Sequence, residues 1–249
     1  MQRSLLGSAP VVKNLIIINV IFWVASIVVF RTFGIQLEQY LGLHYFKSHQ
    51  FMPHQLITYM FMHSYIRMSL GHIFFNMFAL FMFGVMLERV WGSKRFLQYY
   101  LITGIGAGLV QMLVFYIRIQ SLEKGIAPDM IQNIYNNGWS ILQEGKNFSD
   151  PVLAQLNLMI NTSTIGASGA VFGILLAFGM LFPNTQLMLL FPPIPIKAKY
   201  FVIGYGVIEL FAGVANRTGD NVAHFAHLGG MLFGFFLIRY WNKHTKNFY

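Results

Sequence analysis

Cysteine is absent from the 249 residues, and charged side chains are scarce, at 10% of the chain. The lack of cysteine excludes disulfides, thiolate metal sites and cysteine nucleophiles. A soluble globular domain carries roughly 25% charged residues, so this chain has too little charge to cover a soluble surface. Hydrophobic residues make up 56% of the sequence. The composition excludes a disordered chain, a coiled coil and a collagen-like fibre, and predicts a protein with several membrane-spanning segments.

Acidic residues are the rarer charge, with 8 against 17 basic residues and a net charge of +9. The basic residues lie mostly between apolar runs, where they orient a protein in a membrane. No basic stripe alternates with exposed aromatic residues, as a nucleic-acid surface would require. The sequence therefore predicts the lipid bilayer as a partner and no nucleic acid.

Long uncharged runs divide the chain into membrane spans, each of which needs about 20 apolar residues in a helix. The uncharged stretch 151–196 is too long for one span, and prolines at 183, 192, 193 and 195 break it. We expect an all-α membrane protein whose residues 1–249 form a single domain with six transmembrane helices. The predicted spans lie at about residues 14–30, 68–87, 96–117, 165–182, 200–215 and 221–238.

An even number of spans places both termini on one side of the membrane. The loops on that side carry ten basic residues and one acid, against seven basic residues and six acids on the other side. By the positive-inside rule, both termini are cytoplasmic. The expected location is the bacterial cytoplasmic membrane.

Two of the outer loops are long. Residues 31–67 mix aromatic and apolar side chains with polar ones, which predicts a structure lying in the membrane interface. Residues 118–150 are more polar and hold four of the eight acids, with Trp139 as a candidate interfacial anchor.

Polar side chains within the predicted spans are candidates for function, because the lipid environment penalises them. Ser168 follows Gly166 and Ala167 near the start of the fourth span, where unpaired amides favour negative charge. His72 and Asn76 lie one turn apart on one face of the second span, and His227 begins the sixth. Each has an ordinary alternative: a serine bonded to its own helix, a polar pair that bonds a neighbouring helix, or a buried histidine.

Glycines surround these polar residues. Gly169 and Gly173 follow Ser168 in the fourth span, and Gly230 and Gly234 follow His227 at three and seven residues. Small residues four apart let membrane helices approach closely, and such an approach brings a serine hydroxyl within reach of an imidazole. Ordinary glycine-mediated packing produces the same pattern.

Together these residues predict acyl transfer by a serine–histidine dyad. Ser168 would attack a peptide carbonyl while His227 takes its proton as general base. His72, Asn76 and the backbone N–H of Ser168 would stabilise the oxyanion. Phe172 lies one turn beyond Ser168, where its ring can stack on His227. Near His227 in the sequence the only acid that offers itself is Asp220, and the acid in the fifth span, Glu209, has no assigned role.

The chain resembles the rhomboid family of intramembrane serine proteases over nearly all of its length. The resemblance implies a six-helix bundle with a water-filled active site open to the outer face, no cofactor or metal, and single-span membrane proteins as substrates. Three features depart from the family pattern: Phe172 stands where many members have Tyr, the first outer loop lacks a Trp-Arg pair, and the 118–150 loop is long. The motifs that carry the resemblance are Gly166-Ala167-Ser168-Gly169, Ala226-His227 with Gly230 and Gly234, His72 with Asn76, and Glu88-Arg89-Val90-Trp91-Gly92-Ser93.

Two other functions remain open from the sequence. A catalytically silent relative would bind or escort membrane helices without cutting them. A metal-dependent enzyme or a transporter would use His72, His224 and His227, but no carboxylate ligand pairs with them in the sequence. The sequence does not define an oligomeric state.

Overall fold

The structure, a computed structural model, describes residues 8–65, 70–188, 193–215 and 223–244 and is mostly helical. Its apolar helices are α1 (Pro10–Phe33), α4 (Leu70–Trp91), α5 (Ser93–Glu123), α8 (Ser168–Leu181), α9 (Ala198–Ala215) and α10 (His224–His244). The other elements are α2 (Glu38–Leu41), α3 (Gln55–Thr58), the 3-10 helix η2 (Tyr59–Phe61), α6 (Pro128–Gln143), α7 (Pro151–Asn161) and the strands β1 (Gln186–Met188) and β2 (Pro195–Lys197). The two strands form an antiparallel pair with Leu187 opposite Ile196.

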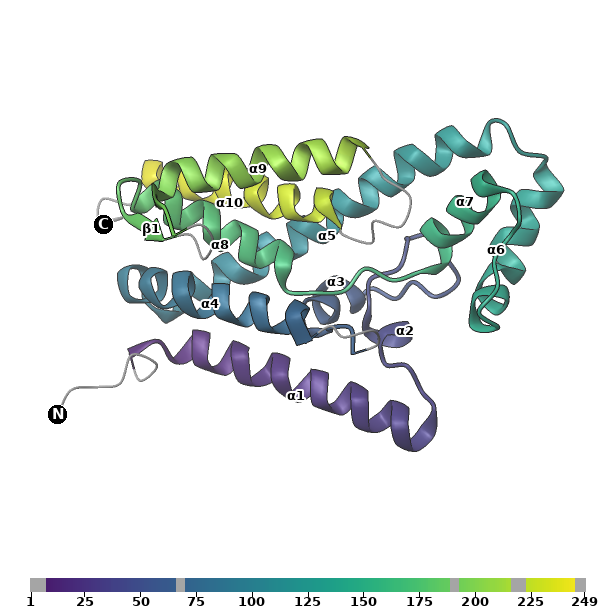
Figure 1. Ribbon diagram of the computed structural model, residues 1–249, viewed down its shortest axis with the longest axis horizontal. Coiled ribbons are helices and arrows are strands. Elements are labelled where there is room, and N and C mark those ends of the chain that lie inside the picture. The colour runs from purple at the N-terminus through teal and green to yellow at the C-terminus, as the bar shows by residue number, and fades with distance from the viewer. Residues whose placement is uncertain (1–7, 66–69, 189–192, 216–222, 245–249) are drawn as a thin grey trace.

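The apolar helices run back and forth along the longest axis of the molecule (Figure 1). Helices α1, α5 and α9 run in one direction, and α4, α8 and α10 run in the other (Figure 1). Helix α10 packs against both α5 and α8, while α4 packs against α1 and α8. Helices α6 and α7 lie at the end of the bundle where α1 and α9 finish (Figure 1).

Four of the described helices are long and apolar enough to cross a membrane: α1, α4, α5 and α9. Helix α8 is apolar but has only 14 residues, about 21 Å of helix against a hydrocarbon core about 30 Å thick. The fold is thus an all-α membrane fold, as expected. Each of the six predicted runs coincides with a helix, although α8 and α10 begin at Ser168 and His224, a few residues inside their runs, and α8 ends at Leu181. Residues 68, 69, 221 and 222 lie outside the described part. The count of six spans stays a prediction.

Much of the loop 31–67 is folded into the protein. The side chains of Leu43, Tyr45 and Tyr59 are almost fully buried, and the Tyr59 hydroxyl donates to the carbonyl of Gly104 in α5 at 2.6 Å. Only some of the apolar residues of this segment, such as Phe46, remain exposed. The expected interfacial location therefore applies to part of the segment.

Residues 118–150 are mostly helical. Helix α5 continues to Glu123, α6 follows, and α7 begins at Pro151 after the side chain of Asp150 accepts from two backbone N–H groups. Ile119, Ile134 and other apolar side chains of α5, α6 and α7 form a second core cluster with Tyr45. Trp139 lies edge-on to the ring of His44, so it contacts the protein as well as its surroundings.

A buried carboxylate joins α4 to the start of α1. Glu88 is 2% exposed, and its two oxygens accept from the backbone N–H groups of Val11 and Val12 at 3.0 and 2.9 Å. It also accepts from the Ser93 hydroxyl at 2.6 Å. The N-cap residue Ala9 makes no side-chain capping hydrogen bond, because its methyl group cannot accept one. Glu88 therefore caps α1 from another helix, where a negative charge also suits the helix dipole.

Replacing Glu88 with Gln removes this charge and one acceptor oxygen. We expect Glu88→Gln to lower the free energy of unfolding by about 1–3 kcal/mol, because a buried N–H group loses its partner. Thermal or denaturant unfolding in detergent measures the change. The exposed Glu144, whose partner is Lys146, is the matched control, and Glu144→Gln should leave stability nearly unchanged. Equal stability of Glu88→Gln and wild type would contradict the capping role.

Candidate active site

Backbone hydrogen bonds fix the segment that leads into α8. Leu43 and Thr164 form an antiparallel bridge with N···O distances of 2.9 and 2.8 Å. Two residues later, the N–H of Gly166 donates to the carbonyl of Tyr59 at 2.9 Å. Helix α8 then begins at Ser168. The segment between α1 and α4 thus positions Ser168 at a helix N-terminus, where the Ser168 backbone N–H has no partner within the helix.

The structure brings Ser168 and His227 together. The Nε2 atom of His227 lies 2.8 Å from the Ser168 Oγ, although the residues are 59 positions apart on different helices. The His227 side chain is 9% exposed. A nucleophile and a base at hydrogen-bonding distance are what a serine acyl-transfer site requires.

Close backbone contact between α8 and α10 makes this distance possible. A Cβ atom on Gly230 would collide with the carbonyl group of Gly169, so only glycine allows the observed approach. Three of the four predicted packing glycines also face α5: a Cβ on Gly169, Gly173 or Gly234 would meet Ala107, Thr103 or Tyr99 of that helix. The small residues therefore serve a junction of three helices, where the sequence suggested two.

The ring of Phe172 stacks on the imidazole of His227. Their centroids are 4.2 Å apart and the planes differ by 6°. This contact restricts rotation of the imidazole and covers one of its faces. The stacking position suggested by the sequence is therefore occupied by Phe172.

Glu209 supplies a carboxylate that the sequence analysis did not connect with His227. Its Oε2 atom lies 2.9 Å from the His227 Nδ1. A carboxylate only accepts, so Nδ1 carries the proton and Nε2 is left free to accept from Ser168. The signal available in the sequence was an ionisable residue inside a predicted span, which is a functional candidate by default.

The same carboxylate oxygen has a second histidine partner. The Nδ1 atom of His224 lies 2.6 Å from Glu209 Oε2. The acid weighed from the sequence, Asp220, lies outside the described residues.

His72 lies beside the turn that precedes the N-terminus of α8. A Cβ atom on Gly166 would stand 3.0 Å from the His72 Nε2 and 3.6 Å from the Ser168 Oγ. The missing side chain of Gly166 therefore leaves the space between these two groups open. Asn76 is buried one turn further along α4, and its amide nitrogen donates to the His72 carbonyl at 2.8 Å.

A further histidine, His63, lies next to the His72 ring. His63 is fully buried, and its ring centroid lies 5.0 Å from that of His72. Burial, together with the nearby His72, lowers the pKa of His63 to about 3. His63 is therefore neutral at physiological pH and adds no charge beside His72.

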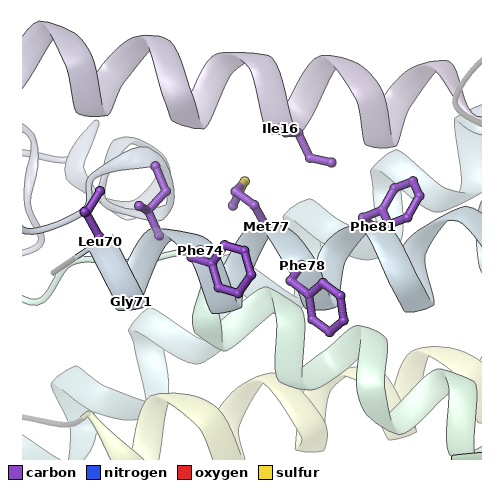
Figure 2. A pocket seen from close by; sticks show the side chains of 8 residues that line it. Ile16, Leu70, Gly71, Phe74, Met77, Phe78 and Phe81 are labelled. Carbon is purple, nitrogen blue, oxygen red and sulfur yellow. The ribbon is translucent and has the colours of Figure 1, made fainter. Parts of the chain in front are cut away.

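An apolar groove lies away from these polar residues. It measures about 700 Å³ and separates α1 from α4, with Ile16 on one side and residues of α4 on the other (Figure 2). Figure 2 shows only carbon and sulfur in the side chains that line it. The groove carries no group for acid–base chemistry and is suited to contact with apolar chains. Its lining residues are Ile16, Leu70, Gly71, Ile73, Phe74, Met77, Phe78 and Phe81.

The fold and the site define a class: a multi-pass membrane protein with a serine–histidine pair between its helices. A protein-family model described as "Eukaryotic integral membrane protein (DUF1751)" matches residues 13–248. The chain belongs to this rhomboid-like family of membrane proteins.

Named relatives agree with this assignment. RHOMBOID-like protein 12, mitochondrial, of Arabidopsis thaliana is 30% identical over 230 residues, which cover 90% of this chain and 56% of the relative. Rhomboid protein 1, mitochondrial, of Saccharomyces cerevisiae is 28% identical over 66% of this chain and 36% of its own length. Rhomboid protease AarA of Providencia stuartii is 27% identical over 66% of this chain and 48% of its own length. The chain thus spans about half the length of the curated relatives it matches.

These comparisons bear on location. The chain is a multi-pass integral membrane protein, as expected. The expected bacterial membrane has no support, because the family description is eukaryotic and two relatives are named mitochondrial. The expected orientation stays a prediction.

The role of the space beside Gly166 can be tested by adding a side chain there. Gly166 has a φ of +126°, a backbone conformation that is strained for any residue with a Cβ atom, and that Cβ would stand between His72 and Ser168. We expect Gly166→Ala to reduce covalent labelling of Ser168 by a fluorophosphonate by about 100-fold or more, in line with loss of an oxyanion donor. Gly125→Ala, whose Cβ would stand in open space, is the control. Full labelling of Gly166→Ala would show that this space is not used.

The contact between Glu209 and His227 is testable with the same reagent. Glu209→Gln offers an amide that can donate to Nδ1 and favour the wrong tautomer, so labelling of Ser168 should slow by roughly 100-fold or more. Glu209→Asp keeps the carboxylate and should recover part of the rate. Unfolding in detergent is measured for both variants. Equal rates for Gln and Asp at equal stability would exclude a positioning role for the carboxylate.

Proposed function

We propose that the chain is an intramembrane serine endopeptidase that cleaves single-span membrane proteins. The observation that carries the proposal is the 2.8 Å contact between Ser168 Oγ and His227 Nε2 across two helices. A serine in a membrane helix ordinarily bonds a carbonyl of its own helix, as Ser26 does with Phe22. Ser168 instead faces a base.

The reaction proceeds by acyl transfer in two steps. Ser168 Oγ attacks the carbonyl carbon of the scissile peptide while its proton passes to His227 Nε2. The C–N bond then breaks, and the leaving amine takes that proton, which leaves an acyl-enzyme. Water attacks the ester in the same way, with His227 again accepting and returning a proton. The products are a carboxylic acid and free Ser168.

Glu209 acts through His227. By accepting from Nδ1 it holds the imidazole in the productive tautomer and stabilises the imidazolium that forms in each step. Stacking with Phe172 fixes the plane of the same ring. The proposal is therefore a triad of Ser168, His227 and Glu209, where the sequence predicted a dyad.

The oxyanion is placed on the side of Ser168 that faces α4. The Ser168 N–H at the start of α8 and the His72 ring are the donors, and Gly166 leaves the space between them. Asn76 contributes by bonding the His72 carbonyl and so fixing that turn of the helix. Its amide can also turn toward the oxyanion when substrate is present.

The depth of Ser168 indicates the substrate class. Helix α8 is too short to cross the bilayer, so a nucleophile at its N-terminus lies below the membrane surface when its other end reaches the opposite face. A peptide bond at that depth belongs to a membrane helix. The helix must unwind locally before its carbonyl becomes accessible, which makes cleavage slow.

We orient the protein with the start of α1 and the end of α10 on the cytoplasmic side or, in a mitochondrion, on the matrix side. These ends and the turn between α4 and α5 lie at one end of the bundle (Figure 1). Basic residues gather there, in the last turns of α4 and α10 and at the start of α5. The active site then opens toward the opposite side.

A catalytically silent rhomboid-like protein is the second candidate. Among the relatives described above, only the name of the bacterial protein contains the word protease. A silent relative would keep the helix bundle and bind membrane helices without cutting them. The intact pair of Ser168 and His227 favours catalysis.

Cleavage of a single-span substrate in liposomes separates the two candidates. We expect Ser168→Ala and His227→Ala each to abolish cleavage, because each removes a group that forms or breaks a bond. A fluorophosphonate should label wild type at Ser168 only.

Ser26→Ala is the matched control, since it alters a membrane-helix serine that bonds its own helix, and it should cleave normally. Cleavage that persists in Ser168→Ala would refute the proposed nucleophile. A folded wild type that binds substrate but neither cuts it nor reacts at Ser168 would establish the silent relative.

A further inference from the structure

Glu209, His224 and His227 form a cluster that the proposed reaction does not fully use. The reaction needs only the contact between Glu209 and His227, yet His224 directs its own Nδ1 at the same carboxylate oxygen. The three ligand atoms all lie within 4.8 Å of one another. Two imidazole nitrogens and one carboxylate oxygen this close together form a donor set suited to a metal.

We propose that Glu209, His224 and His227 form an inhibitory site for a divalent transition metal, with zinc as the physiological candidate. Two histidines and a glutamate are a known zinc ligand set, which leaves a fourth position for water. In the sequence, no carboxylate ligand pairs with these histidines. The structure supplies that carboxylate from α9.

The geometry requires little movement. Zinc binds nitrogen and oxygen at about 2.0–2.2 Å in tetrahedral sites, so its ligand atoms lie about 3.3 Å apart. The two hydrogen-bonded distances to Glu209 Oε2 are 2.6 and 2.9 Å, and a metal that replaces the two protons would widen them by about 0.7 and about 0.4 Å, respectively. His224 and His227 stand one turn apart on α10 with ring planes at 86°. The three side chains are 9% to 14% exposed, which leaves a route for an ion.

Binding would stop the proposed reaction through the tautomer of His227. An imidazole that binds a metal through Nδ1 carries its proton on Nε2. In this site Nε2 faces Ser168, and a protonated Nε2 cannot accept the serine proton. Inhibition rests on the proposed protease function, whereas metal binding does not.

Metal binding is tested on purified Ser168→Ala protein, so that no activity is needed. After treatment with a chelator, the protein is titrated with Co²⁺, whose tetrahedral complexes absorb visible light. We expect one equivalent to bind and Zn²⁺ to displace it, whereas Mg²⁺ should not, because it prefers oxygen ligands. In the same background, His224→Asn should lose the absorption, since its amide reaches a similar position but is a poor ligand. His244→Asn alters an exposed histidine at the far end of α10 and should bind normally.

Inhibition is tested separately by cleavage with and without Zn²⁺, each variant being compared with itself. Zinc should inhibit wild type and His244→Asn at equal concentrations, and the concentration for half inhibition should rise about 10-fold or more in His224→Asn, because even outer-shell partners change metal affinity by about 10- to 100-fold. Absent Co²⁺ binding, or equal binding with and without His224, would overturn the site. A wild type that binds Co²⁺ as expected but never cleaves would refute the proposed function alone.

Discussion

The contact between the backbones of α8 and α10 is the constraint on which the candidate site depends. Gly230 lies against the carbonyl of Gly169 with no space for a side chain between them. Ser168 and His227 stand just before these glycines on the two helices, so the separation of the backbones sets the separation of hydroxyl and imidazole. In a membrane no hydrophobic force drives helices together, and close van der Waals packing of small residues does so instead. The packing that stabilises the bundle thus also creates the geometry that the proposed catalysis requires.

The remaining parts of the site come from segments that are neither α8 nor α10. The Tyr59 hydroxyl donates a hydrogen bond to Gly104 of α5, and the Tyr59 carbonyl accepts one from the N–H of Gly166. One residue of the segment between α1 and α4 therefore links a central helix to the turn before Ser168. His72 enters from α4 and Glu209 from α9. A site assembled from so many elements is only as rigid as their packing. This requirement is consistent with the burial of part of the segment 31–67, whose composition suggested an interfacial location.

Short-range periodicity determined what could be predicted from the sequence. Ser168 and Phe172 are one turn apart on one helix, and His227 and Gly230 are likewise one turn apart, so their shared faces follow from the helical repeat. The apolar runs predicted the six helices because local composition alone defines such runs. Helix α6 was not predicted, because residues 128–143 lie in a segment whose polar composition suggested a loop. Its apolar face becomes evident only in the structure, where it packs in a cluster with Ile119 and Tyr45. Glu209 was visible as a charge in a span, but its partner lies on another helix, beyond a connection whose path the sequence does not specify.

Burial of Glu209 gives a physical reason for its two histidines. A carboxylate 8% exposed among membrane helices loses most of its hydration, at a cost that only hydrogen bonds or a counter-charge can offset. Two imidazole N–H groups supply such bonds, so the buried carboxylate keeps hydrogen-bond partners within the bundle. Those bonds also hold both nitrogens within 2.9 Å of one carboxylate oxygen, and a divalent cation that replaced the two protons would offset the same cost more fully. On the proposed function and metal site, a carboxylate buried to orient His227 therefore also attracts a metal by the same solvation requirement. The proposed catalysis would then persist only while protons occupy that place.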